Sequence, residues 1–539
     1  MTPNRADVLT ERQAPALADA RWFAPAVLTL AAIAAAIPIL IAAVPPVMDF
    51  PNHLARIWLI AGGIHEKPLS SFYEVRWSQA FTNVAVDFLG VALVRACGLA
   101  AAAKVLLAAM LLGPPLAAAV LNRSLFGRAS LWQLAGITLV WCTTAVEGFL
   151  SFQIGIAAGL FCAVALRRTI ARPSPRSLGL AALCAAALLS VHPFAVAMLL
   201  ATLAGLALGE RMTWTWDFLR RRGASVLMLT AACALPVAAL YVLAPHPPGA
   251  YNGEAQLVHF NPVSETLRPK NLALLYASPF LSYRVAWDLV AALPVFGLAA
   301  WAAIVRALRF HAGLLAVAAA MALVAVFLPT NIGDGGALPV RFPIMAALLA
   351  VAGTSIEFRT PPARLVFAVV LTAAAIFRVG SIAWIWNARA GDVQQLRTAA
   401  RSIPVGASVM VLQQKWDGEA PIGRLITACP GGECAAERHF GALTVIWRHV
   451  FVPVLFTVPG QHPIAVRPPW DKNAVYASFI PFTDELAPGE YGDRYLLHWW
   501  KRFDYVLVLD ADLGGTPIPH ARLVRDSGFA RVYRVVPGS

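Results

Sequence analysis

Long apolar stretches alternate with short polar loops over the first two-thirds of the chain. Many stretches are near 20 residues long, and an α-helix of about 20 residues crosses the ~30 Å hydrocarbon core of a bilayer. The pattern predicts about eleven transmembrane spans, at residues 22–44, 101–121, 130–146, 149–166, 178–191, 193–209, 224–243, 285–305, 310–328, 342–357 and 365–386. We therefore expect an all-α polytopic membrane domain over residues 22–386.

The overall composition points to the same class of protein. Of the 539 residues, 59% are hydrophobic and only 13% are charged, and the mean hydropathy is +0.66. Soluble domains carry about twice that charged fraction. Residues 1–21 contain Arg5, Arg12 and Arg21, and no small-residue cleavage site follows the first apolar stretch. We expect a retained first helix rather than a cleaved signal peptide.

The arginines predict the orientation in the membrane. If residues 1–21 are cytoplasmic, every second loop lies in the cytoplasm, and those loops are the basic ones, as the positive-inside rule requires. Their arginines are Arg123, Arg128, Arg167, Arg168, Arg172, Arg176, Arg211, Arg220, Arg221, Arg222, Arg306, Arg309, Arg359 and Arg364. These loops explain the net charge of +14, so we expect no binding of nucleic acid.

Residues 83–97 form an apolar segment whose place is less obvious. They contain Asp87 and Arg95, and counting them as a span would move Arg123 and Arg128 outside the cell. We place the segment in a large first external loop, residues 45–100. There it is predicted to form an amphipathic helix that lies on the bilayer or dips into it.

Residues 387–539 change in character and are predicted to form a soluble α/β domain. An odd number of spans places this segment in the periplasm of a bacterial inner-membrane protein. Residues 407–412 and 505–509 have the pattern of buried strands between Pro and Gly punctuation. Cys429 and Cys434 are close in sequence and would lie in an oxidising compartment. A disulfide and two free thiols are both open interpretations.

The unusual polar residues gather on the external face in this topology. The candidate site residues are Asp49, His53, Arg56, Glu74, His192, Asp334, Arg341 and Arg378. Ionisable groups at a membrane boundary cost free energy unless they are paired or solvated, so their presence favours a functional role. The cytoplasmic loops contain only arginines and nothing that resembles a site.

Asp49, His53 and Arg56 follow the first apolar stretch at spacing i, i+4, i+7. A helix that begins at or just before Asp49 presents all three on one face. Pro51 is tolerated there because it falls in the first turn. Asp49 is a candidate catalytic residue, and simple capping of that helix is the alternative interpretation.

The two external arginines have two interpretations each. Arg341 and Arg378 either extend along the helix to the interface or hold a lipid phosphate, for which the planar guanidinium is suited. His192 precedes Pro193 and is either a helix-end residue or a site residue. No Walker A, HExxH or G-x-S-x-G motif is present, so ATP-driven transport and serine hydrolysis lack their usual signatures.

The stretch Asp49-Phe-Pro-Asn-His-Leu-Ala-Arg56 carries a family resemblance. The chain resembles the GT-C superfamily of integral membrane glycosyltransferases, in which a first helix is followed by a large external loop that opens with an acidic residue. It is also similar to bacterial multi-pass proteins with a D-x-P-N-H-L-A-R motif in that loop. Two features depart from the superfamily: the acid is single, and no WWDYG-like motif is present.

This resemblance implies transfer of a sugar from a polyprenyl-phosphate donor to an unknown glycan, lipid or protein acceptor on the periplasmic face. Asp49 would deprotonate the acceptor hydroxyl, and Arg341 and Arg378 would stabilise the leaving phosphate. His53 or His192 would orient the acceptor or Asp49. We expect no nucleotide and no obligatory metal, with a divalent cation on the phosphate as an alternative.

Two other function classes remain open on the sequence. One is a non-enzymatic transporter or assembly protein for lipid-linked glycans, although no internal repeat is evident and the acids lie near loops. The other is a receptor built on a degenerate transferase fold. In the soluble domain, His439, His449 and His462 are widely spaced and predict no catalytic triad.

Overall fold

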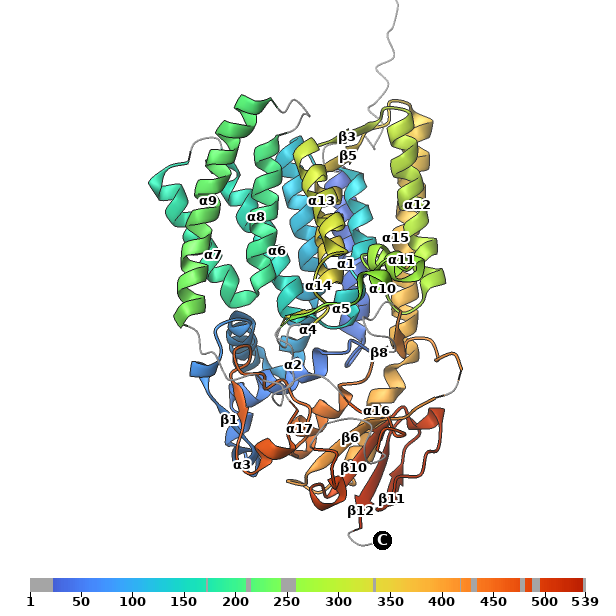
Figure 1. Cartoon of the computed structure of the whole chain (residues 1–539). Coiled ribbons are helices and arrows are strands. Elements are labelled where there is room, and N and C mark those ends of the chain that lie inside the picture. The colour runs from blue at the N-terminus through green and yellow to red at the C-terminus, as the bar shows by residue number, and fades with distance from the viewer. Residues whose placement is uncertain are drawn as a thin grey trace, which may run out of the picture.

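The computed structural model describes residues 23–170, 173–209, 215–243, 258–332, 336–416, 418–427, 434–475, 480–486 and 495–536. Most of the chain is helical, and the helices form a bundle above a smaller mixed domain (Figure 1). The bundle ends at two faces. We call the face that carries Asp49 the Asp49 end, and the opposite face the Glu357 end.

Within the described residues, six helices are long and apolar enough to cross a membrane: α1 (Phe23–Ile41), α4 (Val84–Phe126), α6 (Leu150–Leu166) with the 3₁₀ turn Arg167–Ile170 that extends it, α9 (Trp216–Leu243), α12 (Val285–Ile304) and α15 (Pro361–Ala388). Four shorter apolar helices accompany them: α7 (Pro175–Val191), α8 (Pro193–Leu208), α13 (Ala312–Ala325) and α14 (Leu338–Ala352). The protein is therefore membrane-embedded. The number of eleven crossings stays a prediction.

The span predicted at residues 130–146 is not a continuous α-helix. The segment is a 3₁₀ helix at Leu131–Leu139 followed by the short α5 (Thr143–Val146). It still runs between the two faces, because Trp132 donates to Thr354 near the Glu357 end while the carbonyl of Val146 accepts from Met48 at the other.

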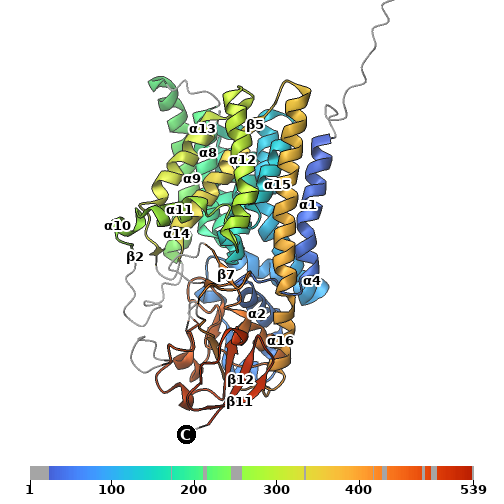
Figure 2. The ribbon, with the colours of Figure 1, turned by 90° about the vertical axis from the view of Figure 1, so that its right-hand side faces the viewer.

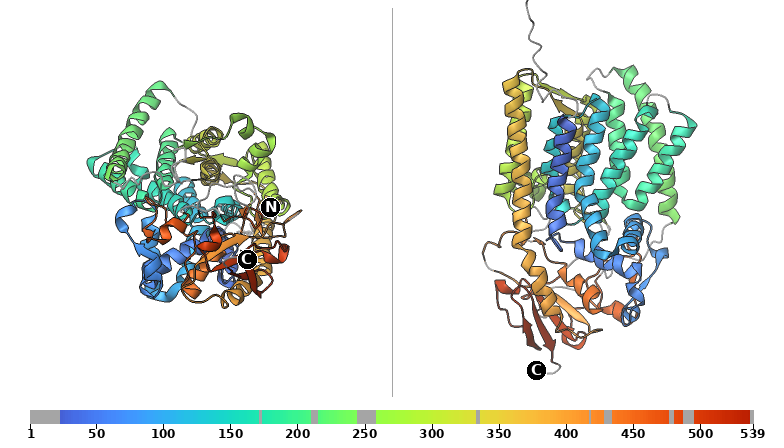
Figure 3. Two further views of the ribbon diagram at one scale, coloured as in Figure 1. Left: turned by 60° about the horizontal axis from the view of Figure 1, so that its bottom comes forward. Right: turned by 180° about the vertical axis from the view of Figure 1, so that it is seen from behind.

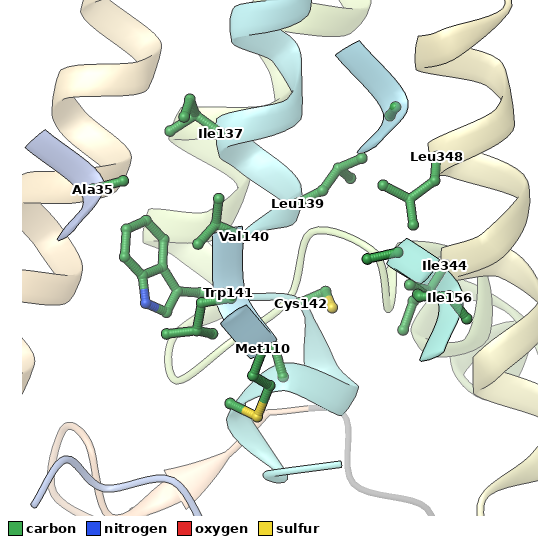
Figure 4. Packing of buried hydrophobic residues seen from close by; sticks show 14 of the residues in the cluster. Ala35, Met110, Ile137, Leu139, Val140, Trp141, Cys142, Ile156, Ile344 and Leu348 are labelled. Atoms are coloured by element: carbon green, nitrogen blue, oxygen red, sulfur yellow. The ribbon is translucent and has the colours of Figure 1, made fainter. Parts of the chain in front are cut away.

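Burial explains why this irregular backbone is tolerated at membrane depth. Every residue from Trp132 to Gly148 is buried, so no backbone amide of the segment faces lipid. Figure 4 shows Val140, Trp141 and Cys142 among side chains such as Met110 of α4 and Ile344 of α14. The segment is the centre of the bundle core, and an apolar run fits that position as well as it fits a helix.

The helix predicted at residues 83–97 is the first part of α4. Gly98 has φ 80° and ψ 164°, so the backbone leaves the helix there and the two parts of α4 meet at a kink. Asp87 lies in the first part and is fully buried. The kink separates this loop helix from the apolar part that follows it.

The soluble domain contains a four-stranded sheet in the order β11 (Ala521–Asp526), β12 (Arg531–Val535), β10 (Tyr505–Leu509), β6 (Val409–Gln413). The two strands predicted from sequence are β6 and β10, and they pair in parallel. The remaining pairs are antiparallel. The long α15 leads directly into α16 (Ala390–Ala400) beside the sheet, as Figure 2 shows.

The first loop and the soluble domain share one hydrophobic core. Leu59, Phe72 and Tyr73 of the loop are buried with residues of the sheet and of α17 (Leu443–Arg448). Strand β1 (Tyr73–Val75) of the loop pairs with β9 (Ile464–Val466) of the domain. The loop helices α2 (Phe50–Ala61) and α3 (Leu69–Phe72) accordingly lie against the domain in Figures 1 and 3. Residues separated by about 400 positions thus meet beneath the bundle.

The other short elements connect helices or join loops. They are β2 (Val258–His259), α10 (Val263–Thr266), α11 (Pro269–Ala277), β3 (Leu308–Phe310), β4 (Asn331–Ile332), β5 (Thr354–Ile356), β7 (Leu425–Ile426) and β8 (Cys434–Ala435). Cys434 is disulfide-bonded. Its predicted partner, Cys429, lies outside the described residues.

Candidate active site

Asp49 lies where the first helix has ended and α2 begins. Its backbone amide donates to the carbonyl of Glu147 at 3.0 Å, which fixes the start of α2 against the end of the buried segment at residues 131–148. Its carboxylate makes no capping hydrogen bond to the helix that follows it in the described chain. The side chain is 13% exposed. Asp49 is therefore a partly accessible carboxylate that helix capping does not use.

Gly148 makes this close approach of the two backbones possible. It has φ +87°, and a Cβ built on it would lie 2.8 Å from the amide nitrogen of Asp49. No side chain fits at that distance, and the left-handed backbone favours glycine independently. The sequence Glu147-Gly148 thus positions Asp49 from the opposite side of the site.

Glu147 is a second acid beside Asp49. It is 1% exposed, and neither carboxyl oxygen has a hydrogen-bond partner among the described residues. Burial, followed by the negative charge of Asp49, raises the pKa of Glu147 well above its ordinary value, and the positive charge of Arg341 opposes this shift in part. Its buried surroundings therefore favour the protonated form of Glu147.

His439 of the soluble domain also reaches Asp49. Its Nδ1 lies 3.0 Å from Oδ1 of Asp49, and the imidazole is fully buried. The residue stands just before the 3₁₀ turn Phe440–Ala442, close to where the domain touches the helical bundle. Asp49 is thus enclosed by three segments that are far apart in sequence.

Arg341 and His192 meet at the Asp49 end of the bundle. Arg341 begins the second turn of α14, His192 caps α8, and Nη1 of the arginine lies 3.0 Å from Nε2 of the histidine. Arg341 Nη2 donates to the carbonyl of Gly336 at 3.0 Å. The guanidinium interacts electrostatically with the carboxyl groups of Glu147 and Asp49. The structure therefore joins two residues that the sequence analysis singled out separately.

Three aromatic rings enclose the guanidinium. Its carbon lies 4.8 Å from the ring centre of Phe149, 5.2 Å from that of Phe152 and 5.1 Å from that of Phe194. Such cation–π contacts hold an arginine in place without neutralising its charge. The positive charge remains available to an anion.

The tautomer of His192 adds a second donor beside Arg341. Nδ1 of His192 accepts from the amide of Phe194 at 3.1 Å, so in the neutral ring the proton is on Nε2. That N–H faces the guanidinium, which also only donates. Two facing donors are satisfied together by an anion that accepts from both. The pair is suited to a phosphate oxygen.

His53 and Arg56 belong to a buried cluster on α2 that adjoins the Asp49 site, because His53 interacts with the backbone of Gly148 and with His439. Arg56 Nε donates to Oδ1 of Asp87 at 2.9 Å, and both side chains are fully buried. Phe456 of the soluble domain packs edge-on against His53 and lies under Arg56. Burial, then the charge of Arg56, lowers the pKa of His53 well below its ordinary value, so the ring is neutral.

Arg378 and Glu74 lie in separate networks. Arg378 is 1% exposed and contacts Asp288, Ser282 and two backbone carbonyls. Glu74 in β1 pairs with Arg467 of the soluble domain at 3.2 Å. These partners occupy both side chains, which favours structural roles for them. Asp334 lies outside the described residues.

The described residues contain no group of three or more His, Cys, Asp or Glu side chains placed to hold a metal ion. The charges around Asp49 come instead from Arg341 and from the buried acid Glu147. The chemistry that this arrangement supports is acid–base and electrostatic: a carboxylate next to an anion-binding pair.

Two residues of this site were missed in the sequence. Glu147 was visible only as an acid between two apolar stretches, and a span boundary is a weak signal. His439 lies about 390 residues from Asp49, so a single sequence contains no spacing that links them. The glycine after Glu147 was the one usable signal, because glycine beside a buried acid suggests close backbone approach.

Comparison with known proteins gave structural matches only. No protein-family model and no curated protein matches the sequence. The chain is similar to crystal structures of ArnT from Cupriavidus metallidurans, bound to undecaprenyl phosphate (TM-score 0.47, covering 96% of this chain and 99% of that one) and in the apo state (TM-score 0.46, 94% and 97%). It is also similar to the oligosaccharyltransferase of Archaeoglobus fulgidus in the apo form (TM-score 0.39, 91% and 70%).

Sequence identity is 12% in each case.

Proposed function

We propose that this protein is a membrane glycosyltransferase that moves a sugar from a polyprenyl-phosphate donor to an acceptor at the outer face of a bacterial inner membrane. The observation that carries the proposal is the placement of the Asp49 carboxylate. It is partly exposed at the membrane boundary, and the charge of Arg341, a guanidinium suited to binding an anion, acts electrostatically on it. The sugar class and the acceptor are not part of the proposal.

The chemistry follows from these two features. Asp49 accepts the proton of the acceptor hydroxyl as the oxygen attacks the anomeric carbon. The bond between that carbon and the phosphate oxygen breaks, and the lipid phosphate leaves with the electron pair. The negative charge that develops on the phosphate requires fixed positive charge or hydrogen-bond donors. Arg341 and the Nε2–H of His192 supply both.

A lipid-borne donor fits the position of this subsite. Its phosphate is attached to a chain that stays in the bilayer, so the phosphate must be bound at membrane depth rather than in the soluble domain. Arg341 and His192 stand at the ends of α14 and α8, where the helices meet the Asp49 end. Their aromatic surroundings exclude water and strengthen the electrostatic contact.

Protonation of Glu147 limits the negative charge at the site where the donor phosphate would bind. In its protonated form it adds no negative charge beside the phosphate. A second carboxylate at that position would repel both the donor and the proton acceptor. The buried backbone that holds Glu147 therefore contributes to the function as well as to the fold.

The proposal is tested by comparing the envelope glycans of four strains by mass spectrometry. They are a deletion strain and the same strain complemented with wild type, with Asp49→Asn or with Asp471→Asn. Asp471 is an exposed acid of the soluble domain and serves as the matched control. Membrane levels of the three proteins are matched by immunoblot.

The expected result is one sugar that is missing in the deletion strain and with Asp49→Asn and is restored by wild type and by Asp471→Asn. That result also names the sugar. A profile that changes on deletion but is fully restored by Asp49→Asn would overturn the proposal and favour transport or assembly.

A further inference from the structure

His439 is the point at which the soluble domain enters the candidate site. Its contact with Asp49 joins a residue after the first helix to one near the middle of the soluble domain, with 3.0 Å between Nδ1 and Oδ1. No part of the function proposed above requires this contact.

The soluble domain holds the histidine tightly. The side chain is buried, and its ring meets Phe456 edge-on with 5.8 Å between ring centres. The backbone carbonyl of His439 accepts from the amide of Ala442 at 3.0 Å. Two residues further on, Gly441 packs so closely on β6 that a Cβ would lie 2.7 Å from Cγ2 of Val411. The position of His439 is therefore set by the sheet.

Because of this contact, the two carboxylate oxygens of Asp49 have different surroundings. Oδ1 is buried and faces His439. The exposed part of the side chain leaves Oδ2 as the oxygen that can meet an acceptor hydroxyl. The Nδ1–Oδ1 distance is that of a hydrogen bond, although the ring is turned away from the best alignment. Catalytic hydrogen bonds often reach good alignment only when the reactants are bound.

We propose that His439 is a positioning residue: its Nδ1–H holds Oδ1 of Asp49, so that Oδ2 points to the acceptor. The soluble domain thereby completes the catalytic centre of the membrane domain. This inference rests on the proposed function in one respect, namely that Asp49 is the base.

Charged and titratable groups of both the helical bundle and the soluble domain interact electrostatically with Asp49. They are Glu147, Arg341, Arg438 and His439, and His439 in turn acts on His53. Of these groups, His439 forms an ion-pair contact with the carboxylate, at 3.0 Å. Its removal changes that contact and leaves the more distant charges in place.

The first experiment needs no substrate. Full-length protein in nanodiscs is treated with a water-soluble carbodiimide and an amine between about pH 4 and 8, and labelling of Asp49 is followed by peptide mass spectrometry. Carbodiimides react with the protonated carboxyl group. The variants are His439→Ala, His439→Asn and the control His498→Asn, an exposed histidine of the same domain.

The expected result is that labelling of Asp49 in His439→Ala persists to higher pH than in wild type, because a hydrogen-bond donor that stabilises the ionised form is lost. The Asn side chain places its amide near the position of Nδ1, so His439→Asn should follow wild type closely, as should His498→Asn. If all four proteins have the same labelling curve, His439 does not act on Asp49 and the inference is wrong.

The second experiment measures transfer of the sugar identified by the glycan comparison, in membranes of the same strains. We expect His439→Ala to lower the rate by about 10- to 100-fold, the loss that follows from one hydrogen bond to a charged group. His439→Asn should stay within about threefold of wild type. The low-pH limb of the rate should move to higher pH only in His439→Ala.

The two experiments separate the two ideas. Loss of the labelling shift, or equal rates in wild type and His439→Ala, overturns the positioning role even if Asp49→Asn abolishes transfer. A labelling shift together with full activity of Asp49→Asn shows that the contact exists and that the proposed function has failed. The melting temperature of His439→Ala shows whether that variant folds. If it does not, a normal labelling curve and rate in His439→Asn support the role, and loss of either in a folded His439→Asn overturns it.

Discussion

Gly148 and Asp49 are in direct backbone contact: a Cβ on Gly148 would lie 2.8 Å from the amide nitrogen and 3.0 Å from the Cβ of Asp49. The same stretch of backbone carries Glu147, whose carbonyl accepts from that amide. The buried segment at residues 131–148 and the start of α2 therefore form one rigid support for the carboxylate.

Gly148→Ala should lower sugar transfer more than the strain of its left-handed backbone alone would. A left-handed alanine costs about 1–2 kcal/mol, and the contact with Asp49 forces a further displacement. The control is Gly127→Ala, which has φ +77° but no heavy atom within 4 Å of the added Cβ. We expect thermal melting to fall in both variants and sugar transfer to be lost only in Gly148→Ala. Equal activity in the two would show that the close approach is unimportant.

Arg341→Lys should weaken binding of undecaprenyl phosphate by about tenfold or more, because lysine loses the planar fork and the fixed position between aromatic rings. Binding is measured by native mass spectrometry of the purified protein. Arg359→Lys, an exposed arginine at the Glu357 end, is the matched control and should bind like wild type. Unchanged binding by Arg341→Lys would remove this residue from the phosphate subsite.

Arg56→Met should destabilise the protein by about 3–5 kcal/mol, because it leaves the buried carboxylate of Asp87 without its partner. The double variant Arg56→Met/Asp87→Leu should recover most of that loss, since it removes both buried charges. The free energy of unfolding is compared from denaturant midpoints in detergent. Recovery of transfer by the double variant would place Arg56 in the fold rather than in substrate binding. A small effect of the single variant would contradict the buried-pair interpretation.

Glu437 should make stability depend on pH. Burial, followed by the charges of Asp510 and Asp392, raises its pKa well above the ordinary 4.5. The native state then binds a proton that the unfolded state releases, so stability falls as pH rises from about 4.5 towards the raised pKa. Glu437→Gln should flatten this decline, as measured by melting temperature between pH 4.5 and 8. Exposed Glu419→Gln is the control. An unchanged slope in Glu437→Gln would contradict the assignment.

Much of the fold could be predicted from the sequence because membrane insertion requires long apolar runs and basic loops. The separation of the helix at residues 84–97 from the apolar part that follows was also predictable, since Asp87 and Arg95 disfavour a span and Gly98 permits a kink. The form of residues 130–146 could not be predicted. Apolar periodicity does not distinguish a helix from irregular backbone once the segment is buried on all sides.

The site was predictable only in part. Asp49, His192 and Arg341 are ionisable residues at predicted membrane boundaries, and this alone singled them out. The partners of these residues could not be predicted from the sequence. Arg378, for example, is an equally unusual arginine, but it forms a buried ion pair with Asp288. Pairing between distant segments decides which polar residues are free for function, and a single sequence does not contain that pairing.

The central claim, that Asp49 performs the chemistry while Arg341 and His192 bind the lipid phosphate, is tested most directly by measuring both steps on the same protein. Wild type and Asp49→Asn are compared in nanodiscs for undecaprenyl phosphate binding and, in membranes, for transfer of the identified sugar. We predict binding within a few-fold of wild type and a loss of transfer of about 10²- to 10⁴-fold. Transfer at the wild-type rate by Asp49→Asn would contradict the account.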